Sequence, residues 1–221
     1  MASTKKIINL DTITAVIFDM DGTMIANMKH HDLAWEEFLR RYSIELSEEE
    51  KKTKISSRRN HEIFGTLFGE DTPSEVREAY AEEKEQLYRD LYKNDIKEVT
   101  GLSSILEKLK KRGLNLAIAT TAPRKNRDFG LKALGLTETF KVIVGNEDVT
   151  RGKPDPQIFL EAAKLLKVEP NQCLVFEDSP VGIEAARNAG MRVVGIATSH
   201  TENELNKAET IIKDFSQIIL K

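Results

Sequence analysis

The chain has 221 residues, 40% of them hydrophobic, which suits one α/β domain with a small insert. Its 33 basic and 36 acidic residues are nearly balanced and lack the basic footprint of a nucleic-acid-binding protein. We find no apolar run long enough to span a bilayer and no signal-like stretch in residues 1–12, so we expect a cytoplasmic protein with no membrane partner. The single cysteine, Cys173, provides neither a disulfide nor a zinc site and is expected in the core.

An apolar run over residues 15–18 ends in Asp19, and Asp21-Gly22-Thr23 follows at once. Four unbroken apolar residues are typical of a strand buried on both faces of a parallel sheet, and ligands bind at the carboxyl ends of such strands. Taken alone, Asp-x-Asp-Gly-Thr fits an ordinary turn or a calcium-binding loop equally well. The remainder of the chain supplies the context for choosing between these interpretations.

Further short apolar runs share this pattern of a polar ending. The runs, with the polar residues after them, are 116–119 with Thr120 and Thr121, 141–144 with Lys153 beyond it, 173–176 with Glu177 and Asp178, and 193–196. Helical stretches at 157–166 and 180–190 alternate with these runs, which predicts a doubly wound parallel α/β sheet. Because parallel strands bring their carboxyl ends to one edge, we expect the polar residues to converge there.

A cluster of carboxylates requires a compensating charge. Two negative charges about 4 Å apart repel by about 4 kcal/mol at an effective dielectric near 20. Oxygen ligands without a histidine or thiolate cluster favour Mg²⁺. A carboxylate not used as a ligand can attack phosphorus, while Lys153, Thr120 and backbone donors near Gly22 stabilise the phosphoryl oxygens. Asp21 is placed to protonate the leaving oxygen and then to activate water.

These residues resemble the motifs of the haloacid dehalogenase-like hydrolases, and within that family the β-phosphoglucomutase-like group with a helical cap. The matching segments, in the family's order, are Asp19-Met20-Asp21-Gly22-Thr23, Thr120, Lys153-Pro154 and Glu177-Asp178. The resemblance spans nearly the whole chain. It implies that Asp19 is the nucleophile and binds Mg²⁺ beside the backbone carbonyl of Asp21 and the carboxylate of Asp178. Asp21 is then the acid/base and Glu177 a direct or water-mediated metal partner.

The segment between the first two motifs has helical patterns. We expect helices from 31 to 42, from Ser47, where Glu50 completes a capping box, and from residue 74 towards 92. No strand-like alternation occurs between residues 30 and 95, and the segment resembles the family's small cap, which closes over the core and excludes water. We therefore expect an α/β catalytic core of residues 1–28 and 95–221 and an all-helical cap of residues 29–94, inserted after the first strand.

By the same resemblance, the cap selects the substrate. Arg58 and Arg59 would bind a remote phosphate or sugar hydroxyl groups, with a solvated basic turn as the alternative. Lys84 aligns with a cap lysine that reaches substrate, and a surface i,i+4 ion pair is an equal alternative. His31 aligns with a family histidine near the acid/base, and Thr121 is assigned to substrate binding. Residues expected to have no chemical role are Trp35, as a packing anchor, and the surface histidines His30, His61 and His200.

We expect a magnesium-dependent phosphatase that hydrolyses a small phosphorylated metabolite, a sugar phosphate, through an aspartyl-phosphate intermediate. The alternatives are a β-phosphoglucomutase-type mutase and a pyrophosphatase. Ser56-Ser57-Arg58-Arg59 departs from the mutase's Gly-x-Ser-Arg, and Ala26 and residues 122–124 also differ from it, which disfavours the mutase. A phospho-accepting receiver-like signalling module uses similar groups, but it is shorter and has no helical insert. We expect a monomer, with a weak dimer as the alternative.

Overall fold

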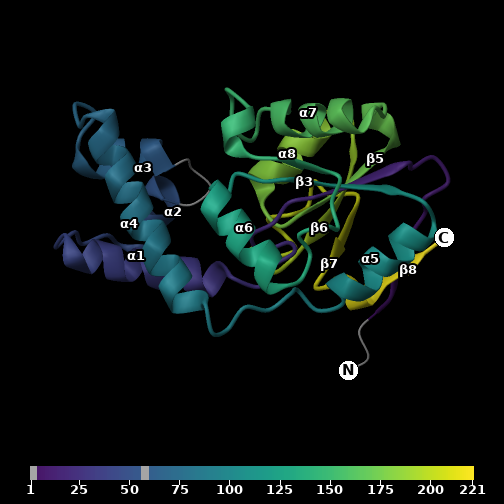
Figure 1. Ribbon diagram of the computed structural model, residues 1–221, viewed down its shortest axis with the longest axis horizontal. Coiled ribbons are helices and arrows are strands. Elements are labelled where there is room, and N and C mark those ends of the chain that lie inside the picture. The colour runs from purple at the N-terminus through teal and green to yellow at the C-terminus, as the bar shows by residue number, and fades with distance from the viewer. Residues whose placement is uncertain (1–3, 56–59) are drawn as a thin grey trace. The chain divides into compact units, whose positions relative to one another are not determined.

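The computed structural model describes residues 4–55 and 60–221, and the chain divides into two compact units. One unit comprises Met1–Ala26 and Ile96–Lys221, and the other comprises Asn27–Asp95. Figure 1 shows the elements of both along the chain. Over the described residues, no helix is both long enough and apolar enough to cross a membrane.

A parallel sheet of six strands, in the order β4-β3-β2-β5-β6-β7, forms the centre of the first unit. A separate parallel pair, β1 and β8, joins residues from near the two ends of the chain. The strands are β1 Lys6–Ile8, β2 Ala15–Phe18, β3 Asn115–Ala119, β4 Val142–Val144, β5 Cys173–Glu177, β6 Arg192–Ile196, β7 Thr210–Ile212 and β8 Ile218–Leu220. The five strands expected from the apolar runs are confirmed as β2 to β6. Strands β1, β7 and β8, which have only three residues each, are not among the strands expected from the sequence.

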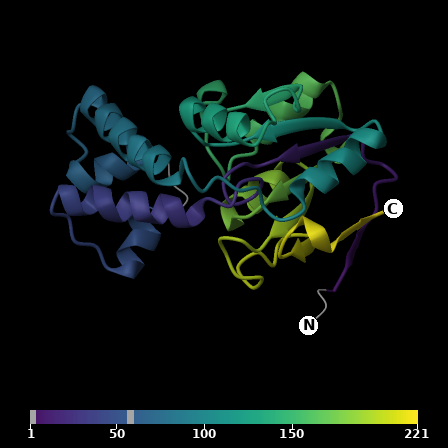
Figure 2. The same cartoon turned by 60° about the horizontal axis from the view of Figure 1, so that its bottom comes forward.

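Helices lie on both faces of the sheet (Figure 2), so the doubly wound α/β fold is confirmed. The helices of this unit are α5 Leu102–Lys111, α6 Arg124–Ala133, α7 Gln157–Leu166 and α8 Pro180–Asn188, with short 3-10 turns η1 Asn146–Asp148, η2 Pro170–Gln172 and η3 Phe215–Gln217. Ile17 and the expected core residue Cys173 pack with buried residues of α7 and α8. Phe18 belongs to the opposite face, where its ring stacks on Phe176 at 5.1 Å and meets Phe215 of η3. Alternate side chains of β2 therefore point to opposite faces of the sheet, and both faces are buried.

All regular elements in the described part of the second unit are helices. They are α1 Met28–Arg41, α2 Glu48–Lys54, α3 Asn60–Phe68 and α4 Ser74–Tyr92. The capping box is confirmed, because Ser47 Oγ accepts the N–H of Glu50 and the Glu50 carboxylate accepts the N–H of Ser47. Helix α1 begins three residues earlier than predicted, since the carbonyl of Asn27 already accepts the N–H of His30 at 2.8 Å.

An aromatic cluster forms the interior of the second unit. Phe38 of α1 is fully buried, with its ring centroid 5.3 Å from Phe64 of α3 and 6.2 Å from Tyr80 of α4. Trp35 packs against Phe38 and Phe64, which confirms its expected role as an anchor. Contacts among large rings from three helices supply this unit with its own hydrophobic core.

The first unit is interrupted by the second, and its two connecting segments pair with each other. The N–H of Ala26 donates to the carbonyl of Lys97 at 3.0 Å, and the N–H of Val99 donates to the carbonyl of Met24 at 2.9 Å. The chain therefore leaves the first unit and re-enters it at adjacent points.

Two glycines that flank α5 provide a test of backbone packing. Gly101 and Gly113 both have positive φ, +85° and +74°. A Cβ on Gly101 would lie 2.8 Å from the backbone nitrogen of Ser216, whereas at Gly113 no atom of the described residues lies within 4 Å. Alanine at either position costs about 1–2 kcal/mol for its left-handed backbone. We expect Gly101→Ala to reduce the free energy of unfolding by at least about 1 kcal/mol more than Gly113→Ala. Urea unfolding measures both values, and equal losses would contradict the close packing of α5 on η3.

Candidate active site

Asp19 follows β2 directly, at the carboxyl end of the central sheet. Its N–H donates to the carbonyl of Phe176 in the neighbouring strand β5 at 3.0 Å, which extends the parallel ladder past the end of β2. Its side chain is only 8% exposed, and its Oδ1 accepts a hydrogen bond from Lys153 Nζ at 2.7 Å. Lys153 comes from the segment between β4 and α7, so two distant parts of the chain meet at this carboxylate.

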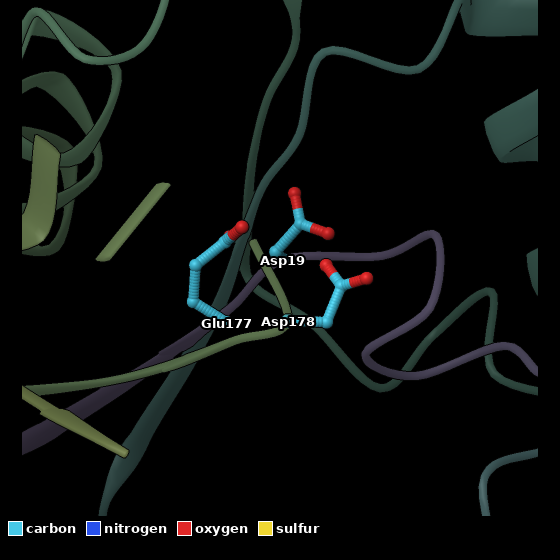
Figure 3. Close-up of side chains that lie close together, drawn as sticks. All are labelled: Asp19, Glu177 and Asp178. Atoms are coloured by element: carbon cyan, nitrogen blue, oxygen red, sulfur yellow. The ribbon is translucent and has the colours of Figure 1, made fainter. Parts of the chain in front are cut away.

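Three buried carboxylates converge at this edge of the sheet. Asp19, Glu177 and Asp178 each offer an oxygen atom that lies within 4.8 Å of those of the other two (Figure 3). Glu177 is the last residue of β5 and Asp178 the next, so β2 and β5 deliver all three groups. The structure thus brings together the two acidic motifs and Lys153.

The Glu177 carboxylate is held on both of its oxygens. Oε2 accepts from Lys153 Nζ at 3.0 Å, and Oε1 accepts from the hydroxyl of Ser179 at 2.6 Å. The first turn of α8 lies against this group, because a Cβ on Gly182 would be 2.0 Å from Oε1. Only glycine leaves room for Glu177 there.

The Asp178 carboxylate has a different set of neighbours. Ser199, in the segment after β6, donates its hydroxyl hydrogen bond to Oδ2, and Thr23 Oγ1 lies 3.5 Å from Oδ1. His200 Nδ1 lies 3.0 Å from the backbone carbonyl of Asp178. His200, expected to be a surface residue without a role, is partly exposed and contacts the loop that carries Asp178. The sequence contained no signal for this segment, since single hydroxyl and imidazole groups in a loop form no recognisable pattern.

The charges in this cluster are unbalanced. Burial raises the pKa of Asp19 well above its ordinary value, and Glu177 raises it further, while Lys153 opposes both effects. Burial, followed by the charge of Glu177, raises the pKa of Asp178 to about 7, against the lowering effect of the hydrogen bond from Ser199. Burial alone would lower the pKa of Lys153, but Asp19 and Glu177 outweigh burial and raise it. Three carboxylates with one ammonium and no sulfur ligand fit a hard divalent cation.

The remaining core residues lie at the same sheet edge or just beyond it. Asp21 is partly exposed, two residues after Asp19, and forms an isolated backbone bridge with Ile25. Thr120 follows β3, the other neighbour of β2, and its buried hydroxyl accepts the N–H of Ala122 at 3.1 Å. Thr121 is exposed. The parallel topology accounts for the position of all three at the carboxyl end of the sheet.

Two of the expected substrate-binding residues contact each other within the second unit. Lys84 Nζ lies 3.0 Å from His31 Nδ1, 3.1 Å from the Glu85 carboxylate and 5.0 Å from the ring centroid of Trp35. The ring of His31 stacks on Tyr88 at 3.9 Å. Because the Lys84 side chain is only 3% exposed, the alternative of a surface i,i+4 pair is wrong.

The other residues of the second unit that the sequence singled out divide into two groups. Arg58 and Arg59 lie outside the described residues, as does the side chain of His61. His30 was expected at the surface, and this is wrong. Its side chain is 13% exposed, its ring centroid lies 4.4 Å from that of Tyr92, and its Nε2 lies 3.6 Å from the Asp95 carboxylate. Tyr92, at the end of α4, covers this imidazole of α1. The local sequence around His30 could not indicate a neighbour from a distant helix.

Comparison with known proteins gives relatives that match nearly the whole chain. Validoxylamine A 7'-phosphate phosphatase from Streptomyces hygroscopicus subsp. limoneus is 30% identical, and the match covers 91% of this chain and 94% of the relative. Beta-phosphoglucomutase from Bacillus subtilis (strain 168) is 30% identical, over 94% of this chain and 92% of the relative. Among solved structures, a HAD hydrolase of family IA, variant 3, from Entamoeba histolytica HM-1:IMSS superposes with a TM-score of 0.85 at 36% identity, covering 94% of this chain and 96% of that one.

The family model described as haloacid dehalogenase-like hydrolase matches residues 16–196. This range begins in β2 and ends with β6, so it contains Asp19, Lys153 and the Glu177-Asp178 pair. The match covers well over half of the chain and agrees with the structural similarity. The chain therefore belongs to the haloacid dehalogenase-like hydrolases and is an enzyme of that family.

Proposed function

We propose that this enzyme is a Mg²⁺-dependent phosphatase that hydrolyses a small phosphorylated metabolite, a sugar phosphate, through an aspartyl-phosphate on Asp19. The observation that carries the proposal is the buried Asp19 carboxylate, fixed at 2.7 Å by Lys153 beside Glu177 and Asp178. The names of the two curated relatives, one a phosphatase and one a phosphoglucomutase, support a phosphorylated substrate.

In the first half-reaction, an Asp19 carboxylate oxygen attacks phosphorus, and the bond from phosphorus to the leaving oxygen breaks. The carboxyl group of Asp21 gives its proton to that oxygen. In the second half, the Asp21 carboxylate takes a proton from water, and the water oxygen attacks the aspartyl-phosphate. This step releases inorganic phosphate and regenerates Asp19.

We assign the cation to Asp19, Asp178 and the backbone carbonyl of Asp21. Glu177 is a water-mediated partner in this assignment, because Lys153 and Ser179 already engage its two oxygens. When bound, Mg²⁺ offsets the repulsion between the anionic nucleophile and the anionic phosphate. Lys153 contributes positive charge at the same place, and Thr120 contributes a hydroxyl for the phosphoryl oxygens.

Substrate choice is assigned to the second unit and to the exposed Thr121. Arg58, Arg59, His31 and Lys84 are the proposed contacts with the part of the substrate remote from the reacting phosphate. The buried Lys84 ammonium, shared between His31 and Glu85, is suited to a polar group rather than an apolar one. A pyrophosphatase remains an alternative within the same chemistry, whereas the family match over residues 16–196 excludes the receiver-like module.

The mutase is the second candidate, favoured by 30% identity to a beta-phosphoglucomutase over 94% of this chain. Phosphorus NMR distinguishes the two activities when the protein is supplied with Mg²⁺, β-glucose 1-phosphate and a trace of glucose 1,6-bisphosphate. We expect free phosphate and no glucose 6-phosphate. Accumulation of glucose 6-phosphate would overturn the phosphatase in favour of the mutase. Free phosphate would justify testing a panel of sugar phosphates and pyrophosphate.

Replacing Asp19 by asparagine tests the nucleophile. Asp19→Asn removes the attacking anion, and we expect turnover to fall by about 10³-fold or more. The far-ultraviolet circular dichroism spectrum should not change, because asparagine has nearly the same shape. Asp128→Asn, at an exposed position of α6, is the matched control and should keep full turnover. Multiple turnovers by Asp19→Asn would contradict the assignment.

The proposed metal site can be tested by measuring thermal stability, which requires no substrate. The folded pKa of Asp178, about 7, lies above the ordinary value of 3.8, so its charge destabilises the metal-free fold as the pH rises through this range. In chelator at pH 8 we expect Asp178→Asn to raise Tm by about 5 °C, and by less at pH 5, where Asp178 in the wild type is protonated. Thermal unfolding measures both differences.

Added Mg²⁺ should reverse this order of Tm values, so that wild type becomes more stable than Asp178→Asn. Wild type gains stability because the cation binds only the folded state, and Asp178→Asn gains little. Asp128→Asn again serves as the control and should follow wild type. Equal responses to Mg²⁺ in wild type and Asp178→Asn would contradict a metal site at Asp178.

A further inference from the structure

The segment Thr198–His200 follows β6 and reaches two of the acidic loops. Strand β6 is the sheet neighbour of β5, with Gly195 opposite Glu177, so the residues after β6 emerge beside Asp178. The proposed mechanism uses none of the three side chains of this segment. Each of them nevertheless has a polar contact with a loop that carries a proposed metal ligand.

Ser199 and His200 form a small hydrogen-bonded network on Asp178. The Ser199 hydroxyl lies close to Asp178 Oδ2, 3.1 Å from the Asp178 carbonyl and 2.8 Å from His200 Nδ1. A serine has one hydroxyl proton, and donation to the charged carboxylate is the strongest use of it. His200 Nδ1, 3.0 Å from the same carbonyl, is then assigned as the N–H donor to that carbonyl.

Thr198 connects the same segment to the loop after β2. Its Oγ1 donates to the carbonyl of Gly22 at 2.5 Å. Gly22 follows Asp21 directly, and its own N–H donates to the carbonyl of Ile25 at 2.9 Å. The segment after β6 therefore bonds to both loops that supply proposed ligands.

The segment is itself fixed at each end. Before it, the N–H of Ala197 donates to the carbonyl of Ile212 in β7 at 2.8 Å. After it, Glu204 Oε2 accepts two hydrogen bonds from Thr201. One comes from the N–H of Thr201 at 2.9 Å and the other from the hydroxyl group of Thr201 at 2.8 Å. Leu205 then enters the core with no exposed surface. These attachments allow a short side chain such as serine to set the direction of a neighbouring carboxylate.

We propose that Ser199 is a positioning residue that orients the Asp178 carboxylate for Mg²⁺, and that Thr198 holds the Gly22 backbone in the matching arrangement. This inference rests on the proposed function, because it takes Asp178 to be a metal ligand. The chemistry is that of an outer hydrogen-bond donor, which leaves the carboxylate charged and restricts its rotation.

The test is a Mg²⁺ titration of Tm in the substrate-free protein. We expect Ser199→Ala to require about tenfold more Mg²⁺ than wild type for half of the maximal stabilisation. Ser199→Thr retains a hydroxyl and should recover most of the affinity. In turnover assays, the same shift should appear in the Mg²⁺ dependence of Ser199→Ala, with kcat largely restored at saturating Mg²⁺.

Ser103→Ala is the matched control, because Ser103 also donates its hydroxyl to a carboxylate, that of Glu98, at an exposed position. This variant should respond to Mg²⁺ as wild type does. If Ser199→Ala also responds as wild type while Asp178→Asn does not, the positioning role is overturned and the proposed function stands. If wild type shows no stabilisation by Mg²⁺, both are overturned.

Discussion

The organisation of this enzyme depends on one electrostatic constraint, the burial of three carboxylates beside a single ammonium group at the carboxyl edge of a parallel sheet. Charges removed from water are costly unless they are paired, and here Lys153 can pair with only part of the negative charge. The free energy for holding them comes from the apolar interior of the sheet, where Phe18 and Phe176 stack directly behind the acidic residues. Without a cation, the negative charges of the three carboxylates repel one another. A bound divalent cation would reduce this repulsion.

The three carboxylates are chemically alike, and their neighbours make them different. Lys153 holds an oxygen of Asp19, and the hydroxyl of Ser179 and the ammonium of Lys153 together occupy Glu177. Asp178 instead receives hydroxyl contacts, which add no charge. Lys153 therefore pairs with Asp19 and Glu177, whereas the described hydrogen-bond partners of the Asp178 carboxylate are hydroxyl groups.

The sequence predicted the parts of this structure that follow from local patterns and from parallel topology. The run before Asp19 indicated a buried strand. Because parallel strands end at one edge of the sheet, the sequence also predicted that Lys153 lies near Asp19, 134 residues away in the chain. The pairing of β1 with β8 could not be predicted, because each strand has three residues and the partner lies at the far end of the sequence. The roles assigned to individual site residues remain predictions.

The burial of Lys84 and the contacts of Ser199 were beyond the sequence for a physical reason. A lysine among glutamates on a helix is normally solvated, and only the packing of α1 against α4 makes this one an interior residue. A serine in a loop becomes informative only when the strand beside it is known. Tertiary neighbours, rather than local propensity, decide both cases.

The paired connectors at Ala26–Lys97 and Met24–Val99 have an evolutionary consequence. An insertion whose two ends are adjacent and hydrogen-bonded to each other closes on itself, so its length and content can change without pulling on the strands that carry Asp19 and Asp178. Mutation and recombination can therefore exchange the inserted helices while the reacting groups stay in register. The inserted helices of such a chain can diverge between relatives while the acidic edge of the sheet keeps its geometry.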